Sequence, residues 1–280
     1  MPIERKIKNK IHGKDSRDGA GVNLKRVFAH GEVKDLDPFL LLDSFDSTDP
    51  QDYIKGFPWH PHRGIETVTY LLNGKIEHGD SLGNSGTIDE GCFQWMSAGS
   101  GIIHQEMPKA SDRMLGIQLW VNMPSKKKMS EPAYRDIRKE DVVLARNDGI
   151  CEVRIIAGIY NGYKGPVEDL SVDPIFLDVI VRAGKTFKLN TRHDDTVFAF
   201  IIDGNGNFQG KVYPKRTGFL YENGDFIEFA ASDRDVRVLV FSGKKLNEPV
   251  AWGGPIVMNT QKELQLAFEE LDKGTFIKHK

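Results

Sequence analysis

Between Phe39 and Val121 the chain consists of short apolar or alternating segments that Gly, Asn and Asp separate at short intervals. This texture is typical of the strands and turns of a β-sandwich or β-barrel. The same texture returns later in the chain, in the segments Ile175–Arg182, Thr196–Asp203, Gly218–Tyr221, Asp225–Phe229 and Val236–Phe241. We therefore predict an all-β protein with two successive barrels.

The length of 280 residues also favours two domains, because single hydrophobic cores stop growing near this size. Residues 124–141 read PSKKKMSEPAYRDIRKED, a polar and charged stretch with two prolines that suits a connection between domains. We expect an N-terminal domain over residues 1–135 and a C-terminal domain over residues 136–280. The Lys126–Lys128 run is interpreted as a solvated face of this connection.

Three local features refine this outline. Residues 1–36 look irregular except for one alternating stretch over residues 24–29. Asn73-Gly74, between residues 66–72 and 75–78, predicts a two-residue hairpin turn. Near the end of the chain, Thr260 and Glu263 form a capping-box pattern before apolar residues at helical spacing, so one amphipathic helix is predicted to end before Gly274.

Composition excludes several classes of function. The 38 basic and 40 acidic residues give a formal charge of −2, which disfavours direct binding of nucleic acid. No run approaches the roughly 18 apolar residues of a membrane helix, and the first residues lack a secretory signal, so a cytoplasmic location away from membranes is expected. The two cysteines show no CxxC spacing, so a metal would be held by imidazole and carboxylate groups.

Two compact clusters provide such groups. Side chains at positions i and i+2 of a strand point to the same face, so His60 and His62 project together, as do His104 and Glu106. Two adjacent strands would then offer four converging ligands. Three imidazoles and one carboxylate suit Fe(II), Mn, Ni, Zn or Cu, and an octahedral ion held by four ligands keeps two positions open for substrate, dioxygen or water.

The run FPWHPHRGIETVTYLLNGKIEHGDSLGNSGTIDEGCFQWMSAGSGIIHQEMP closely resembles the signature region of pirins, which are members of the cupin superfamily. Further matches are DPFLLLDSF, GIQLWVNMP and EPVAWGGPIVMNT, in the expected order along the chain. The resemblance implies two consecutive cupin barrels, of the double-stranded β-helix or jelly-roll type, followed by a C-terminal helix. It also implies one metal ion, usually iron, in the N-terminal barrel.

Carried over by position, the pirin ligands fall on His60, His62, His104 and Glu106. In many other cupins the carboxylate ligand follows the HxH pair by a few residues, where Glu66 stands here, so Glu66 is kept as a group that orients a ligand. His78, in a polar context after Gly74, is interpreted as a surface residue. The aromatic and sulfur side chains that could line an apolar pocket beside the metal are Trp59, Phe93, Trp95, Met96 and Trp120.

The resemblance implies a metal-dependent dioxygenase of the quercetinase class, because some pirins cleave flavonols with dioxygen. Glu106, or else Glu66, would accept the proton of the substrate hydroxyl. Other pirins act as iron-dependent partners of transcription factors, so a redox-sensing regulator that binds protein is the alternative. A third possibility is a cupin that acts on an unrelated small metabolite. We expect iron(II) as the cofactor, a small flavonol-like substrate and a monomer.

Overall fold

The computed structural model describes residues 1–279 and divides into two compact units. Unit 1 contains residues 1–14, 34–38 and 140–245, and unit 2 contains residues 15–33, residues 39–139 and the chain from 246 onward. Segments of the two units therefore alternate along the sequence. Their bounds differ from the predicted domain ranges 1–135 and 136–280. Two short segments, α1 (Val33–Leu36) and η3 (Lys139–Asp141), lie where the division falls.

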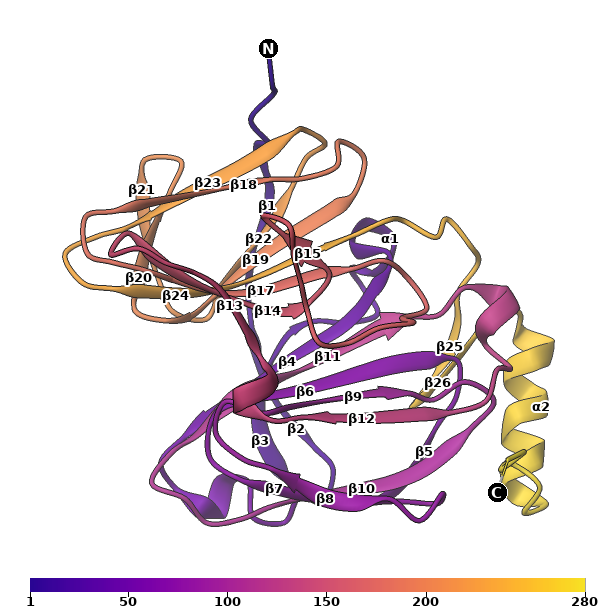
Figure 1. The fold of residues 1–280 in the computed structure, drawn as a ribbon. Coiled ribbons are helices and arrows are strands. Elements are labelled where there is room, and N and C mark those ends of the chain that lie inside the picture. Colours follow the sequence, from indigo (N-terminus) through magenta and orange to yellow (C-terminus); the bar gives the residue numbers. More distant parts are fainter. Residues whose placement is uncertain (280) are drawn as a thin grey trace. The chain divides into compact units, whose positions relative to one another are not determined.

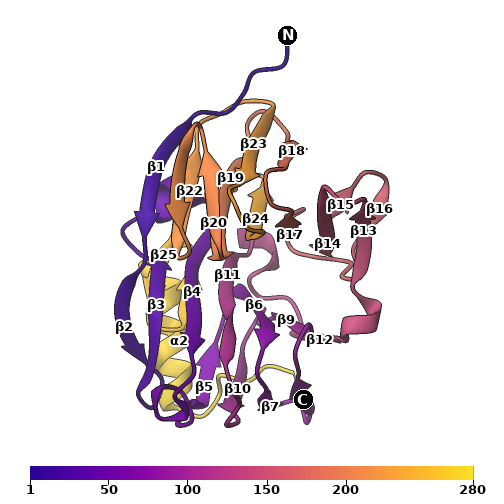
Figure 2. The same ribbon diagram turned by 90° about the vertical axis from the view of Figure 1, so that its left-hand side faces the viewer.

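Unit 2 is built from two antiparallel sheets that face each other, with the smaller sheet below β6, β9 and β12 in Figure 1. The larger sheet has the order β12 (Ala133–Ile137), β9 (Phe93–Ser97), β6 (Ile65–Asn73), β11 (Met114–Asn122), β4 (Phe39–Ser47), β3 (Val22–Phe28) and β2 (Lys14–Asp18). The smaller sheet has the order β5 (Phe57–His62), β10 (Ile102–Pro108), β7 (Ile76–Asp80) and β8 (Ser85–Ile88). Figure 2 shows β3, β4, β11 and β6 side by side.

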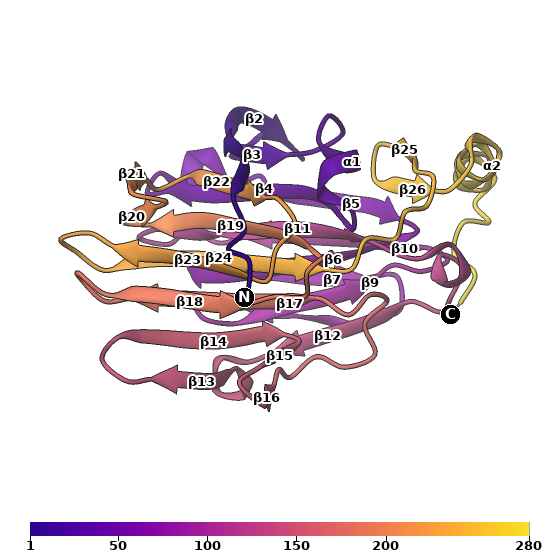
Figure 3. The same ribbon diagram turned by 90° about the horizontal axis from the view of Figure 1, so that it is seen from above.

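Unit 1 repeats this architecture. Its larger sheet has the order β1 (Ile7–His12), β22 (Thr217–Tyr221), β19 (Thr196–Asp203), β24 (Val236–Gly243), β17 (Ile175–Val181), β14 (Cys151–Ala157) and β13 (Val143–Asn147), several of which can be followed in Figure 3. Its smaller sheet has the order β18 (Thr186–Asn190), β23 (Phe226–Ala231), β20 (Asn205–Phe208) and β21 (Lys211–Pro214), and β15 (Ile159–Tyr160) pairs with β16 (Tyr163–Lys164). The prediction of an all-β chain with two barrels is confirmed.

The interiors of the two barrels differ in chemistry. The interior of unit 1 is filled by apolar side chains, among which the rings of Phe208 and Phe219 stack with centroids 4.0 Å apart. The interior of unit 2 contains buried polar side chains such as Thr69, Gln94 and Glu106. Because buried polar groups are costly unless they are hydrogen-bonded, a polar interior marks the barrel in which function is to be sought.

The predicted C-terminal helix is present as α2 (Gln261–Asp272), and Thr260 and Glu263 form the capping box. In unit 2 this helix packs beside the hairpin of β25 (Ala251–Gly253) and β26 (Ile256–Met258). Two single-turn segments, η1 (Pro50–Asp52) and η2 (Ser125–Lys127), complete the elements. Among the described residues, no helix combines the length and the apolarity needed to cross a bilayer.

Three local predictions were wrong. Residues 1–36 are not irregular, because β1, β2 and β3 lie there; β1 is mostly exposed and so lacks an alternating apolar pattern. One division between the units falls inside the polar stretch 124–141, after Lys139, but the residues before it are not a simple connection, because they contain β12, which pairs with β9 as the edge strand of its sheet. Edge strands tolerate polar and charged side chains, so composition alone concealed it.

Asn73-Gly74 does not close a hairpin. β6 pairs with β9 and β11, whereas β7 pairs with β10 and β8 in the other sheet of unit 2. Gly74 has φ +105°, the conformation that the dipeptide predicts. Here the chain uses that conformation at a corner, where it leaves one sheet for the other. The dipeptide therefore predicted the backbone conformation of Gly74 correctly, but the predicted pairing of β6 with β7 was wrong.

Candidate metal centre

The two histidine clusters lie on neighbouring strands of the smaller sheet in unit 2. β5 and β10 are antiparallel, and His104 lies directly opposite His60 in their register. Opposite residues of an antiparallel pair have their Cβ atoms about 4.5–5.5 Å apart and on the same face. The alternation that the sequence predicts therefore brings His60, His62 and His104 to one point.

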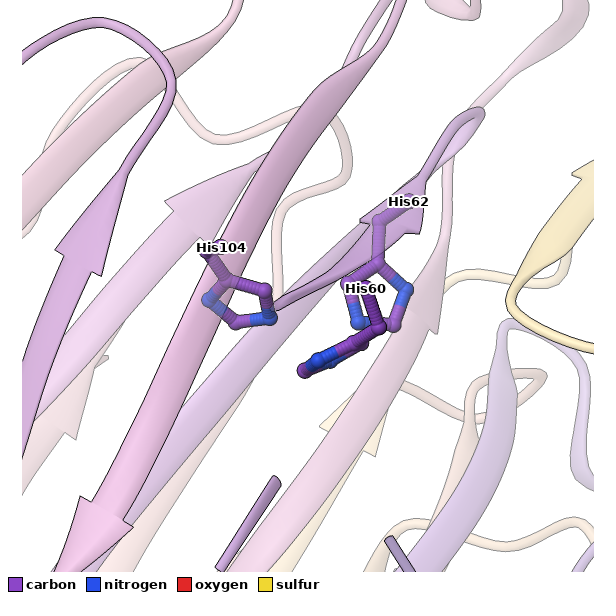
Figure 4. Close-up of side chains that lie close together, drawn as sticks. All are labelled: His60, His62 and His104. Atoms are coloured by element: carbon purple, nitrogen blue, oxygen red, sulfur yellow. The ribbon is translucent and has the colours of Figure 1, made fainter. Parts of the chain in front are cut away.

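The three imidazoles converge closely. Their ring centroids are separated by 4.4 Å between His60 and His104, 4.8 Å between His60 and His62, and 5.0 Å between His62 and His104. The side chains point toward one another in Figure 4, and one ring nitrogen from each lies within 4.8 Å of the others. His62 and His104 are buried and His60 is half-buried. Such a cluster matches the three-imidazole arrangement of many metal sites.

Hydrogen bonds to the rings of His60 and His62 leave one nitrogen of each free to bind an ion. The Nδ1 atom of His60 lies 2.8 Å from the carbonyl oxygen of Pro58, and that of His62 lies 3.1 Å from the carbonyl oxygen of Pro255. A carbonyl oxygen only accepts, so each Nδ1 carries the hydrogen and each Nε2 keeps its lone pair. This is the arrangement that orients histidine ligands in metalloproteins.

His104 gives the clearest sign that the residues fit a metal. Both of its ring nitrogens are buried, and neither has a hydrogen-bond partner within the described residues. Leaving a buried nitrogen unsatisfied is costly, and an ion is one of the few ways to satisfy it. Burial lowers the pKa of His62 and of His104 well below the ordinary value, and the neighbouring imidazoles add to the effect. The neutral, metal-binding form is therefore favoured.

Glu106 lies next to this group but is not part of it. Its side chain is buried, with Oε1 accepting a hydrogen bond of 2.8 Å from Thr69 and Oε2 accepting one of 2.7 Å from Gln118. The structure therefore gathers three of the four residues proposed as ligands and holds the fourth, by its carboxylate, against the larger sheet. Each oxygen of a carboxylate can accept two interactions, so both oxygens keep capacity for a further partner.

Glu66 faces away from the histidines. Its carboxylate accepts hydrogen bonds from Trp95 Nε1 at 3.2 Å and Ser97 Oγ at 2.8 Å. Thr69, three residues along β6, bonds Glu106, and residues separated by an odd number lie on opposite faces of a strand. The alternation that relates His60 and His62 does not continue to Glu66, because the chain turns at Gly64 (φ +76°) and enters the other sheet.

A cavity of ≈ 510 Å³ opens beside the histidines within unit 2. His60 and His62 form part of its wall, together with the aromatic side chains of Trp59, Trp120 and Trp252. Of the side chains that the sequence suggested for a pocket wall, Trp59 and Trp120 line this cavity, whereas Phe93, Trp95 and Met96 are buried core residues outside its wall. A volume of this size suits a small organic ligand.

Charged groups face the same cavity. Arg26 donates from Nε to Asp43 Oδ1 at 2.9 Å and from Nη2 to Asp43 Oδ2 at 2.7 Å, and it also bonds Asp18 at 2.7 Å. Burial raises the pKa of Asp43 against the opposing effect of Arg26. The wall of the cavity thus combines aromatic side chains with the bidentate ion pair of Arg26 and Asp43.

The interpretation of His78 as a surface residue was wrong. His78 is buried, with its Nε2 atom 3.1 Å from Asp136 Oδ2 and its Nδ1 atom 3.0 Å from the hydroxyl of Tyr134. Tyr134 donates to Gln94 Oε1 at 2.5 Å, and Gln94 Nε2 donates to Asp136 Oδ1 at 2.8 Å, which closes a ring of four side chains. His78 lies opposite Glu106 in the register of β10 and β7.

The interpretation of Lys128 as part of a solvated face was also wrong. It is 1% exposed, and its ammonium donates to the carbonyl oxygens of Gly64 at 2.8 Å and Val257 at 2.8 Å, and to Asn122 Oδ1 at 2.7 Å. Burial lowers the pKa of Lys128 to about 7. One buried cation thereby ties β26 to the turn that follows His62.

Sequence reasoning also missed Thr69 and Gln118, the residues that donate hydrogen bonds to Glu106. A signal was present, because polar residues interrupt the apolar strands TVTYLL and GIQLWV at these positions. Polar side chains in a strand that is buried on its inner face need partners there.

Two barrels of paired sheets, with three converging histidines inside one of them, define a bicupin protein with a candidate metal centre. The family model named Pirin matches residues 21–121, and the model named Pirin C-terminal cupin domain matches residues 176–277. The chain belongs to the pirin family.

Relatives of known name cover almost the whole chain. A pirin-like protein of Caulobacter vibrioides is 39% identical over 278 residues, which cover 99% of this chain and 100% of the relative. A Pseudomonas aeruginosa protein named "Putative quercetin 2,3-dioxygenase" is 40% identical over 271 residues, covering 94% of each chain. The crystal structure of a quercetin 2,3-dioxygenase from Acinetobacter baumannii superposes with a TM-score of 0.88 at 30% identity and covers 98% of both chains.

Proposed function

We propose that this protein is a metal-dependent dioxygenase of the quercetinase class, with iron(II) as its metal and a flavonol-type compound as its substrate. The observation that carries the proposal is the convergence of three available imidazole nitrogens beside a cavity with aromatic walls. The names of the Pseudomonas and Acinetobacter relatives support the same reaction. We also propose that it works as a cytoplasmic monomer, as the sequence predicts.

In this proposal His60, His62 and His104 hold the ion, with Glu106 as the fourth ligand or as a base beside it. The bound metal would supply a Lewis acid and redox centre accessible to a hydroxylated substrate and to dioxygen. Glu106 accepts the proton of the substrate hydroxyl at a carboxylate oxygen, and the bonds from Thr69 and Gln118 hold that carboxylate in place. Glu66 is not assigned this role, because it faces the other side of β6.

The cavity is suited to a flat aromatic substrate. Trp59, Trp120 and Trp252 offer large apolar surfaces, and aromatic rings gain from offset or edge contacts with such walls. The Arg26–Asp43 pair offers hydrogen-bonding groups to the phenolic hydroxyls of a flavonol. Such a combination of apolar walls and a few polar groups is typical of small-molecule sites.

The test is metal content of anaerobically purified protein, followed by oxygen uptake with quercetin. We expect about one iron per chain and flavonol-dependent uptake in the wild type, and neither in His62→Ala. His193→Ala is the matched control, because His193 lies in unit 1 with a half-exposed ring bonded to Asp225. Iron bound without turnover would instead favour the regulator that acts through a protein partner.

A further inference from the structure

Both oxygens of the Glu106 carboxylate are held by groups that sit on the larger sheet of unit 2. Thr69, on β6, donates its hydroxyl to Oε1 at 2.8 Å, and Gln118, on β11, donates its amide nitrogen to Oε2 at 2.7 Å. β6 and β11 are neighbours, and Thr69 lies directly opposite Gln118 in their register. Two residues that lie opposite each other in one sheet therefore both donate hydrogen bonds to a single carboxylate on the facing sheet.

Trp120, which only donates, and Glu106, which only accepts, together set the direction of every hydrogen bond among these four residues. An indole N–H only donates, and Trp120 Nε1 lies 3.1 Å from Gln118 Oε1. The amide oxygen of Gln118 must therefore face Trp120, and its NH2 group must face Glu106 Oε2 and, at 3.3 Å, Thr69 Oγ1. Thr69 accepts from Gln118 and gives its only hydroxyl hydrogen to Glu106. One placement of the hydrogen atoms therefore satisfies all the hydrogen bonds that link Trp120, Gln118, Thr69 and Glu106.

Trp120 also links these hydrogen bonds to the candidate metal centre by direct contact. Its ring meets the imidazole of His62 edge to face, with centroids 5.1 Å apart and an interplanar angle of 86°, and it forms part of the cavity wall. One side chain thus contacts a proposed ligand, faces the space for substrate, and orients the amide that holds the carboxylate.

We propose that Trp120, Gln118 and Thr69 are positioning residues that present the Glu106 carboxylate to the metal through a one-directional hydrogen-bond chain. The inference rests on the proposed metal site but does not depend on dioxygenase activity. Loss of the indole N–H leaves the amide oxygen of Gln118 without its donor, so that only the bonds on its NH2 side still position the amide beside Glu106. Partners that orient metal ligands affect metal affinity about 10–100-fold when they are removed.

The experiment measures Co(II) binding to the full chain, by competition with a chromophoric chelator and by the visible spectrum of the Co(II)-loaded protein. We expect Trp120→Phe and Thr69→Val to weaken Co(II) binding roughly 10-fold or more. Their spectra should shift toward that of Glu106→Gln, which lacks the carboxylate. Thr69→Ser restores a hydroxyl and should restore both the affinity and the spectrum.

Trp95→Phe is the matched control. Trp95 also donates its indole N–H to a buried carboxylate, that of Glu66, but on the opposite face of β6. It should change neither the Co(II) affinity nor the spectrum, and circular dichroism of all variants checks that each is folded. If Trp120 cannot be replaced without unfolding, the Thr69→Val and Thr69→Ser pair decides.

The outcomes separate failure of the positioning role from failure of the dioxygenase reaction. The inference is overturned if Trp120→Phe and Thr69→Val bind Co(II) with the affinity and spectrum of Trp95→Phe. It is also overturned, together with the metal site, if the wild type does not bind Co(II). A wild type that binds Co(II) and shows the expected variant effects, but whose iron form consumes no oxygen with quercetin, refutes the dioxygenase and leaves the positioning role standing.

Discussion

The Nδ1 atom of His62 lies 3.1 Å from the carbonyl oxygen of Pro255, 193 residues further along the chain. This bond places the hydrogen on Nδ1 and leaves Nε2 for an ion. The segment that closes unit 2 therefore decides which nitrogen of a proposed ligand is available. The HxH motif alone predicts the ligand but not its tautomer.

His104→Leu should abolish metal binding and at the same time stabilise the metal-free protein. Both ring nitrogens of His104 are buried with no partner among residues 1–279, so an apolar side chain removes their cost, by about 1–3 kcal/mol. Urea unfolding of metal-free wild type and variant measures this difference. A less stable variant would show that the imidazole is satisfied in another way.

Lys128→Met should change how stability depends on pH. Burial lowers the pKa of Lys128 to about 7 in the folded protein, while an unfolded lysine titrates near 10.4. Between these values the unfolded chain binds one more proton, so stability rises with pH across that window, by up to about 1.4 kcal/mol per unit. Below pH 7 both states are protonated and the contribution is flat.

The measurement for Lys128 is the free energy of unfolding at pH 7, 8 and 9 in wild type and Lys128→Met. The wild type should gain stability relative to the variant as the pH rises. The variant should be less stable throughout, because Gly64, Asn122 and Val257 lose a donor to their oxygens. Parallel pH curves for the two proteins would contradict the lowered pKa.

Tyr134→Phe should destabilise unit 2 by about 2–3 kcal/mol, since it leaves buried groups of His78 and Gln94 without a partner. Thermal unfolding followed by tryptophan fluorescence checks this. Tyr163→Phe removes an exposed hydroxyl from unit 1 and should stay within about 0.5 kcal/mol of the wild type. Equal effects of the two substitutions would argue against the buried ring.

Gly64→Ala should be far more harmful than Gly83→Ala. Both glycines have positive φ, +76° and +89°, so both substitutions strain the backbone by about 1–2 kcal/mol. A Cβ at Gly64 would also lie 2.0 Å from the carbonyl oxygen of Val257, whereas a Cβ at Gly83 meets no atom of the described residues within 4 Å. The denaturant midpoints and the metal content of the two variants should separate the effect of the clash from that of the strain. Similar midpoints for the two variants would contradict the predicted clash at Gly64.

Strand alternation was enough to predict that His60, His62 and His104 converge, because the two motifs lie on strands that pair directly. The same rule failed at Glu66, since a glycine turn and a change of sheet intervene. It also said nothing of His78 and Lys128, whose burial depends on partners 58 and 129 residues away along the chain. Short-range patterns describe a strand and its faces, but not which distant segment covers them.

Unit 2 is interrupted in sequence by most of unit 1 and is completed only by the chain from residue 246 onward. During synthesis on the ribosome, the strand that bears His60 and His62 emerges before most of unit 1, whereas Pro255 and Val257 emerge only after all of unit 1 has been made. Until then His62 and Lys128 lack partners that the finished fold provides. The candidate metal centre can therefore reach its complete geometry only after unit 1 has been translated.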